Sequence, residues 1–256
     1  MTRWIATFFL ALCAMLVSLT AEPIKILPLG DSLTAGISSG GAGFTIVGGY
    51  RLPLLDQLQK AGYDAMLVGP SLLNSPPPTQ LGGDKSTYHA GFPGFRLDQL
   101  QGALSAQSWF FLLGEGGQLS TPKEINYILL MAGTNDLLHG TKPNLLLAKL
   151  KKLVDSLQRW YPSAYIGVAT LPPLFPTSFA PRAASEKLRN YNQLLRIDFA
   201  KRKSDRVQLI EIYDALATGE DFKGGDGIHP SQPAAFEKMA NHWFEFIQRQ
   251  ELAKPQ

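Results

Sequence analysis

Short apolar runs that alternate with longer amphipathic stretches are the feature of this chain that most constrains its fold. The runs are apolar without alternation, as is typical of strands buried on both faces. Between them, apolar residues recur at spacings of three and four, the period of a helix with one buried face; residues 146–160, just before Pro162, are the clearest example. The sequence therefore predicts an α/β fold, a three-layer α/β/α sandwich around five parallel strands. The predicted strands are residues 24–29, 65–68, 127–131, 165–169 and 207–212.

The connections of this predicted sheet include unusually long loops. Residues 38–49 are rich in glycine, and residues 71–89 contain a proline triplet and a Gly-Gly pair. Both follow strands, at the edge of a parallel sheet where ligands bind; a third loop, residues 114–121, precedes the central strand. The final helix is expected to begin near Ser231, a residue type that caps helix N-termini. We expect one domain over residues 22–256, since no repeat or linker-like stretch divides them.

Residues 1–21 have the pattern of a cleaved secretion signal. Arg3 precedes an apolar stretch, residues 4–19, and Leu19-Thr20-Ala21 then offers a small residue for cleavage. A retained membrane anchor is the alternative, but the apolar core of about 16 residues is shorter than the roughly 20 that span a bilayer. Cleavage would remove Cys13, the one cysteine of the chain. We therefore expect a secreted, extracellular protein with no stable membrane anchor and no disulfide.

The charge balance of the chain is too small to indicate a polyanionic partner. There are 24 Lys and Arg residues against 21 Asp and Glu, a formal net charge of +3. Nucleic acids and anionic surfaces recruit much stronger basic patches, so no nucleic-acid partner is expected. Three of the four histidines, His89, His139 and His242, are dispersed and form no His-x-x-x-His pair of the kind that binds zinc. We expect no metal and no cofactor.

The segment Gly30-Asp31-Ser32-Leu33-Thr34 places a hydroxyl directly after the first predicted strand. Gly30 permits a tight turn there, and a serine hydroxyl becomes a nucleophile when a base lies beside it. The alternative is structural, with Asp31 or Ser32 capping a following helix. Nucleotide binding is disfavoured because no Gly-x-Gly-x-x-Gly or Gly-Lys-Ser/Thr pattern follows.

Two later segments could supply the partners of such a serine. Asn135, in Gly133-Thr134-Asn135-Asp136, follows the central strand and can direct its amide N–H at a developing oxyanion, or it can cap a turn. In Asp226-Gly227-Ile228-His229-Pro230, the carboxylate can orient the imidazole while the other ring nitrogen faces Ser32. The alternative there is a loop in which Asp226 accepts backbone N–H groups and His229 only caps.

A fourth segment, Gly91-Phe92-Pro93-Gly94-Phe95, has two interpretations that the residues alone do not separate. Glycine allows close approach of the backbone, so an N–H group here can join an oxyanion hole. The same residues also suit a turn with proline at its second position and glycine at its third.

Taken together and in this order, the segments resemble the SGNH hydrolases, the GDSL esterases and lipases. The resemblance implies a flavodoxin-like fold and ester hydrolysis through an acyl-enzyme, without a cofactor. It implies that Ser32 is the nucleophile and that His229 and Asp226 complete the triad. It also implies that the Ser32 N–H, the Gly94 N–H and the Asn135 side chain stabilise the oxyanion. Under this resemblance residues 22–256 form the catalytic domain.

Residues 49–58 and 67–69 also look like the secreted carbohydrate esterases of family 3, the acetyl xylan esterase type. Those enzymes tend to have Glu-Gly-His-Ser-Gly-Trp where this chain has Ala90-Gly91-Phe92-Pro93-Gly94-Phe95. This likeness implies a small ester or acetylated carbohydrate as substrate. A lipid ester or an acyl thioester is the alternative, and a secreted binding protein without activity is the alternative function.

Aromatic and basic residues near the predicted site could contact such a substrate. Phe44, Phe92 and Phe95 offer flat faces to a sugar ring, and Arg51 and Arg96 can donate hydrogen bonds to its hydroxyls. The alternative is that the aromatic residues form a satellite core under the loops.

Overall fold

A parallel β-sheet forms the centre of the molecule. The computed structural model describes residues 22–40, 48–75, 87–105 and 125–254. The sheet has six strands, five of them in the order β2-β1-β4-β5-β6, and the short β3 pairs with β1. This confirms the predicted parallel sheet and adds β3, whose two residues are too few for a recognisable apolar run. The strands are β1 (Ile24–Gly30), β2 (Ala65–Leu67), β3 (Ala90–Gly91), β4 (Tyr127–Met131), β5 (Tyr165–Ala169) and β6 (Val207–Ile210).

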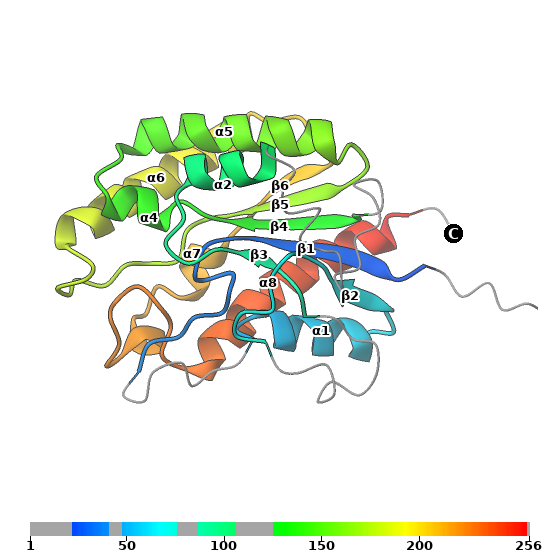
Figure 1. Cartoon of the computed structure of the whole chain (residues 1–256), viewed down its shortest axis with the longest axis horizontal. Helices are drawn as coiled ribbons and strands as arrows, with labels where there is room; N and C mark the ends of the chain where they lie inside the picture. Colours follow the sequence, from blue (N-terminus) through cyan, green and yellow to red (C-terminus); the bar gives the residue numbers. More distant parts are fainter. Residues whose placement is uncertain (1–21, 41–47, 76–86, 106–124, 255–256) are drawn as a thin grey trace, which may run out of the picture.

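Helices cover both faces of this sheet, as the sandwich prediction required (Figure 1). Buried residues of α2, α5 and α6 share one apolar cluster with one face of the strands, and those of α1 and α8 share the other cluster. The helices are α1 (Arg51–Lys60), α2 (Leu97–Ser105), α4 (Thr134–Leu138), α5 (Pro143–Trp160), α6 (Arg182–Ala200), α7 (Ile212–Ala215), the 3₁₀ turn η3 (Glu220–Phe222) and α8 (Pro233–Leu252).

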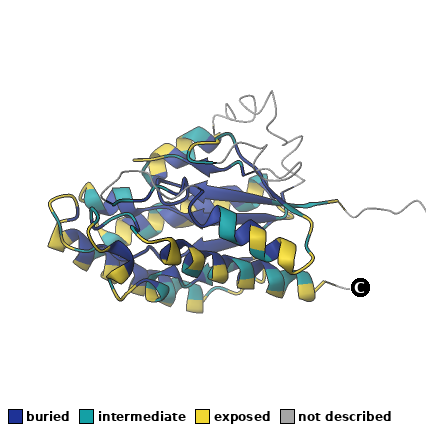
Figure 2. Cartoon of the chain, turned by 90° about the horizontal axis from the view of Figure 1, so that it is seen from below, coloured by how far each residue is buried: buried dark blue, intermediate teal, exposed yellow. Residues whose placement is uncertain are grey.

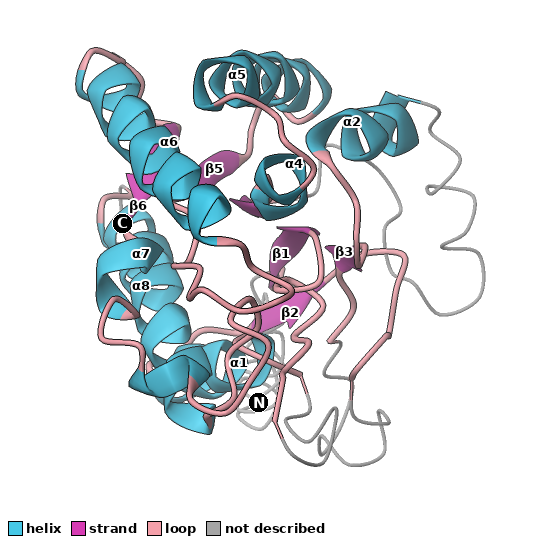
Figure 3. Ribbon diagram, turned by 90° about the vertical axis from the view of Figure 1, so that its left-hand side faces the viewer, coloured by secondary structure: helices cyan, strands magenta, loops and turns pink. Residues whose placement is uncertain are grey.

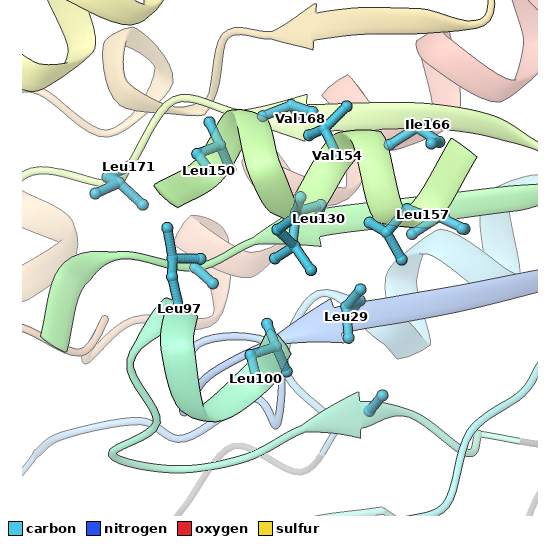
Figure 4. Packing of buried hydrophobic residues seen from close by; sticks show 14 of the residues in the cluster. Leu29, Leu97, Leu100, Leu130, Leu150, Val154, Leu157, Ile166, Val168 and Leu171 are labelled. Carbon is cyan, nitrogen blue, oxygen red and sulfur yellow. The ribbon is translucent and has the colours of Figure 1, made fainter. Parts of the chain in front are cut away.

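The two cores follow directly from the alternation of side chains along each strand. In β4, Ile128 and Leu130 pack against one helical layer, and Leu129 packs against the other. Buried strands therefore lie between helices that are exposed on their outer sides (Figure 2). Side chains of α5 meet β4 and β5 at the helical spacing seen in the sequence (Figure 4), and fully burying a leucine stabilises a fold by about 2 kcal/mol.

Strand register brings the two central motifs to the same edge of the sheet. β1 and β4 are neighbours, and Gly30 pairs with Met131, so the two strands end level with each other. The chain then turns into the segments that carry Ser32 and Asn135. Figure 3 looks onto this edge, where loops gather in front of the strand ends between α1, α4 and α6.

Two sequence predictions about element ends were wrong. Ser231 does not cap the last helix: α8 begins at Pro233 with Gln232 as N-cap, because proline suits the first helical position. The Ser231 hydroxyl instead hydrogen-bonds to the carbonyls of Asp221 and Lys223. The last strand ends earlier than predicted, at Ile210, and α7 begins two residues later.

Several predictions lie outside the described residues, namely the secretion signal at residues 1–21, the loop at residues 114–121 and Phe44. Among the helices of the described ranges, none combines the length and the apolar character needed to cross a bilayer.

Candidate active site

The three residues predicted to form a triad are in hydrogen-bond contact. The Oγ atom of Ser32 lies 2.8 Å from Nε2 of His229, and Nδ1 of His229 lies 2.6 Å from Oδ2 of Asp226. A serine hydroxyl, an imidazole and a carboxylate in this sequence allow the ring to take the serine proton while the carboxylate stabilises the resulting imidazolium. Ser32 and His229, which are 197 positions apart in the chain, are thereby brought into contact.

Asp226 has two functions in its loop, one structural and one directed at the ring. Its Oδ1 accepts the backbone N–H groups of Ile228 and His229, each at 2.8 Å, while Oδ2 faces the imidazole. The structure thus shows the backbone N–H contacts of the loop interpretation and the carboxylate–imidazole contact that the catalytic interpretation needs, both made by Asp226. Partial burial of Asp226 opposes its charge, but the His229 ring and these N–H groups hold the pKa of the carboxyl well below its usual range. The carboxylate is thus ionised at neutral pH.

Gly227 allows the tight turn between Asp226 and His229. Its φ of +78° lies in the left-handed region, and a Cβ atom there would lie 2.1 Å from the Phe175 carbonyl oxygen. That oxygen is so close because Phe175 donates its N–H to the carbonyl of Gly227. Glycine therefore lets the loop before α6 pack directly against the loop that carries His229.

Ser39 and Thr177 tether this loop from two other parts of the chain. The Ser39 hydroxyl donates to the His229 carbonyl at 2.6 Å and accepts the Asp226 N–H at 3.2 Å. The Thr177 hydroxyl donates to the Asp226 carbonyl. Neither residue stood out in the sequence, since a serine or threonine in a loop carries no distinguishing local pattern.

Removing the Ser39 hydroxyl should loosen the catalytic loop. Ser39→Ala leaves a carbonyl and an N–H without their partner, at about 1 kcal/mol for each hydrogen bond. We expect kcat to fall about tenfold with little change in KM, because a misplaced base impairs chemistry more than binding. Steady-state kinetics on 4-nitrophenyl acetate will measure this. Ser231→Ala is the matched control, because that hydroxyl contacts Asp221 and Lys223; equal losses in both variants would contradict the tether.

Hydrogen bonds connect the turn that carries Gly94 to the Gly30 motif and to the Asn135 motif. Phe92 donates its N–H to the carbonyl of Gly30 at 3.0 Å, and the carbonyl of Phe95 accepts the Asn135 side-chain N–H at 3.0 Å. Within the turn, Phe95 donates its N–H to the carbonyl of Phe92, and Gly94 has a φ of +80°. This is the geometry of a type II turn, so the turn interpretation of the motif is confirmed.

The same turn distinguishes the two glycines as oxyanion donors. The Gly91 N–H is engaged, since it donates to Nδ1 of His89 at 3.0 Å. For the exposed Gly94, the described residues include no acceptor for its N–H. Asn135 uses one of its two amide N–H groups on Phe95 and keeps the other. Gly94 and Asn135 are therefore able to receive an oxyanion, and the third expected donor, the Ser32 N–H, stays a prediction.

Asp136 fixes the position of this turn through the helix that follows it. Its buried Oδ2 accepts the N–H of Leu97, the first residue of α2, and its Oδ1 lies 3.2 Å from the Lys149 ammonium. The Arg96 N–H is accepted by the Gln99 side chain, as in a capping box. The sequence analysis considered Asp136 only as a possible cap of its own turn; it caps a helix 39 residues away.

Loss of the Asn135 amide should lower turnover without unfolding the protein. Asn135→Ala removes one oxyanion donor, and such changes reduce kcat by about 100- to 1,000-fold. Asn135→Asp is the informative companion, because it keeps the size of the side chain but presents a negative charge to the oxyanion. Kinetics on an activated acetyl ester, with circular dichroism as a folding control, will test both; a loss below about fivefold in Asn135→Ala would remove Asn135 from the oxyanion hole.

Asp31, beside the serine, carries a second buried carboxyl. Its Oδ1 accepts the Leu33 N–H at 3.0 Å, and its Oδ2 meets no hydrogen-bond partner among the described residues. Burial raises the pKa of this carboxyl to about 6, although the Leu33 N–H and the nearby His229 favour the ionised form. Because the pKa is about 3.9 in the unfolded chain, the folded state binds the proton more tightly between about pH 4 and 6.

Stability should therefore fall through this Asp31 titration as the pH rises. The contribution is complete below about pH 4 and is lost above about pH 6, with a magnitude of about 3 kcal/mol. Asp31→Asn does not titrate, so its unfolding free energy should rise relative to the parent by about that amount from pH 4 to pH 7. Urea unfolding of both proteins at the two pH values gives this difference; a difference that is the same at both would contradict a raised pKa.

The residues predicted to contact the substrate differ in how far they are exposed. Arg51 as a substrate ligand is wrong: it is 0% exposed, and its guanidinium donates to the backbone carbonyls of Ala35, Thr87 and Asn74. Arg51 therefore connects, from within the protein, the three loops that contain Ala35, Asn74 and Thr87. Phe92 and Phe95 stack on each other with ring centroids 5.0 Å apart, and Phe92 also packs on the core. Both rings and Arg96 are half-buried, so their contact with substrate stays a prediction.

Comparison with known proteins shows the family of this chain. Residues 29–234 match the model of the GDSL-like Lipase/Acylhydrolase family. The chain belongs to this family. It is also similar to a multidomain esterase of Ruminococcus flavefaciens, with 31% identity over 255 residues that cover 95% of this chain and 31% of that protein. This GDSL-like chain thus spans about a third of the length of that relative.

Solved structures share the fold of this GDSL-like chain at low sequence identity. A family 3 carbohydrate esterase of Clostridium thermocellum has a TM-score of 0.64 and 23% identity, and the match covers 91% of this chain and 100% of that one. A family 3 carbohydrate esterase of Talaromyces cellulolyticus has a TM-score of 0.64 and 16% identity, with 90% and 100% covered. A serine-to-alanine mutant of an acetyl esterase, solved with an acetate ion, has a TM-score of 0.65 and 16% identity, again with 90% and 100% covered.

Proposed function

We propose that this GDSL-like chain hydrolyses carboxylic esters through a covalent acyl-enzyme. The observation that carries the proposal is the unbroken contact from Ser32 through His229 to Asp226, at 2.8 Å and 2.6 Å. Beside it lie donors suited to an oxyanion, the Gly94 N–H and the second Asn135 amide N–H. A nucleophile, an oriented base and separate oxyanion donors are the parts that acyl transfer requires.

The reaction takes two similar steps. His229 accepts the Ser32 proton as Oγ attacks the ester carbonyl, and Gly94 and Asn135 stabilise the negative charge on the carbonyl oxygen. Collapse of this intermediate breaks the bond to the alcohol, which leaves with the proton from His229. Water then loses a proton to His229 as it attacks the acyl-enzyme, and the proton returns to Ser32 as the acid is released. No redox step or cofactor takes part.

The proposed substrate is a short acyl ester, most simply acetyl, on a carbohydrate. The named relatives support this: two are family 3 carbohydrate esterases and one is an acetyl esterase. Two described loops at the site, residues 31–40 and 222–232, also support it, because they are rich in glycine and serine and offer little apolar wall for a long acyl chain.

An acyl chain-length series tests this substrate proposal. We expect kcat/KM to fall from acetyl through butyryl and octanoyl to palmitoyl esters of 4-nitrophenol. A rise through octanoyl would favour the lipid-ester alternative. Absence of turnover on every ester of the series would favour the binding-protein alternative.

We also propose that residues 1–21 are removed during export and that the mature enzyme acts outside the cell. N-terminal sequencing of the protein recovered from the medium of an exporting host is expected to start at Glu22. Recovery of the intact N-terminus in the membrane fraction would instead favour an anchor.

A further inference from the structure

A shallow depression adjoins the triad on the side of Asp226. Its volume is about 330 Å³, and it is formed by residues 39–40, 177–179 and 224–226. They include Ser39 and Thr177, which tether the loop of Asp226 and His229, and Asp226 itself, so the depression borders the site. We propose that it binds a sugar unit of the alcohol half of the ester, with the Phe179 ring as the stacking surface. The inference rests on the proposed function and adds where the carbohydrate lies.

The direction of proton transfer places the alcohol half on this side of the serine. Nε2 of His229 must reach the leaving alcohol oxygen, while the carbonyl oxygen lies at Gly94 and Asn135. The alcohol half therefore extends past His229. The wall behind His229 is Asp226, bonded to its ring at 2.6 Å, together with Ser39, bonded to its carbonyl at 2.6 Å. Both residues line the depression.

Phe179 is unusual for an aromatic side chain in this protein. It is 69% exposed, while the other exposed large apolar side chains of the described residues are leucines and an isoleucine. An exposed flat ring beside a polar cleft suits the apolar face of a pyranose, whose C–H groups cover the ring while its hydroxyls stay in water.

The turn that presents Phe179 is rigid, which favours binding. The Thr177 hydroxyl oxygen accepts the N–H groups of Phe179 and Ala180, at 3.2 Å and 3.1 Å, and its O–H donates to the Asp226 carbonyl. Thr177 also donates its own N–H to the Ala180 carbonyl at 3.0 Å. The backbone at Phe179 is thus held before substrate arrives, and little of it has to be ordered on binding.

Gly224 and Gly225 line the depression and add no side chain to it. Gly224 has a φ of +74°, and a Cβ atom added to it would meet nothing within 4 Å. Gly225 packs tightly instead, since a Cβ atom there would lie 2.3 Å from the Ser39 hydroxyl oxygen. The backbone at these two glycines therefore forms a low rim beside Asp226, over which a saccharide can pass.

Kinetics on two substrates test the inference. We expect Phe179→Ala to lower kcat/KM on acetylated xylotetraose about tenfold, mainly through KM, as losing cover on one face of a ring implies. On 4-nitrophenyl acetate, which lacks a sugar, it should stay within about twofold of the parent. Phe179→Trp should keep the saccharide activity. Leu145→Ala, which truncates another exposed apolar side chain on α5, is the control and should change neither rate.

The outcomes separate this inference from the proposed function. Equal effects of Phe179→Ala on both substrates, or none on either, would overturn the sugar site. Turnover of the nitrophenyl ester without turnover of the acetylated saccharide would overturn it too, while the esterase proposal stands. If neither is turned over, the esterase proposal fails, and calorimetry with unacetylated xylotetraose decides the site: binding that weakens in Phe179→Ala supports it, and equal or absent binding overturns it.

Discussion

Ser32→Ala is expected to abolish turnover of acetyl esters while leaving the fold unchanged. The loss should be on the order of a millionfold, as when the nucleophile of another serine hydrolase is removed. The fold should persist because, among the described residues, the hydroxyl makes one side-chain hydrogen bond, to His229, and it contributes little to packing. Hydrolysis of 4-nitrophenyl acetate and thermal unfolding of the parent and the variant measure the two halves of this prediction.

Covalent labelling tests Ser32 as the nucleophile without relying on ester turnover. A fluorophosphonate reagent should add one phosphonyl group to the parent, on the peptide that contains Ser32, and none to Ser32→Ala. Ser231→Ala is the control for a loop serine next to His229 and should label like the parent. Activity of Ser32→Ala within about tenfold of the parent, or labelling at another serine, would refute the assignment of the nucleophile.

The central part of the fold could be predicted because each strand is buried on both faces. The runs at β4 and β5 matched the observed strands residue for residue, since every position faces one of two apolar layers. Prediction failed where a local pattern had two explanations. Ser231 looked like a cap, but its hydroxyl is used inside the loop and Pro233 begins the helix.

The contacts among the candidate site residues were predictable because their chemistry is concentrated in short motifs. Asp226 and His229 are three positions apart, so a single loop encodes their pairing. The residues that hold this pairing in place were missed because their partners are distant in sequence: 187 positions separate Ser39 from Asp226, and 49 separate Thr177 from Asp226. A hydroxyl that bonds to a backbone group leaves no local pattern to recognise.

Arg51 was misassigned for a related physical reason. Arginine is mostly exposed in folded proteins, and a position next to a Gly-rich loop suggested contact with substrate. Its two terminal guanidinium nitrogens instead donate to several backbone carbonyls at once, which loops without regular structure leave unpaired. Only the three-dimensional arrangement of residues 35, 73, 74 and 87 shows that their carbonyls require a shared donor.

Asp226→Asn is the substitution that isolates the orientation of the base. Asparagine keeps an oxygen that can accept the N–H groups of Ile228 and His229, so the loop should hold its shape. Its amide N–H would face Nδ1 of His229 where a carboxylate oxygen now accepts. The ring would then carry its proton on Nε2 and donate to Ser32 rather than accept from it, a reversal that costs on the order of ten-thousandfold in kcat.

Asp226→Asn should therefore lose activity while keeping its stability. We expect kcat on 4-nitrophenyl acetate to fall by about four orders of magnitude with thermal unfolding nearly unchanged. Asp226→Ala removes the backbone acceptor as well, and it should lose both activity and stability. Asp56→Asn, on an exposed carboxylate of α1, is the control and should match the parent in both measurements. A nearly active Asp226→Asn would mean that another acceptor orients His229, which would leave Ser32 and His229 to act as a dyad.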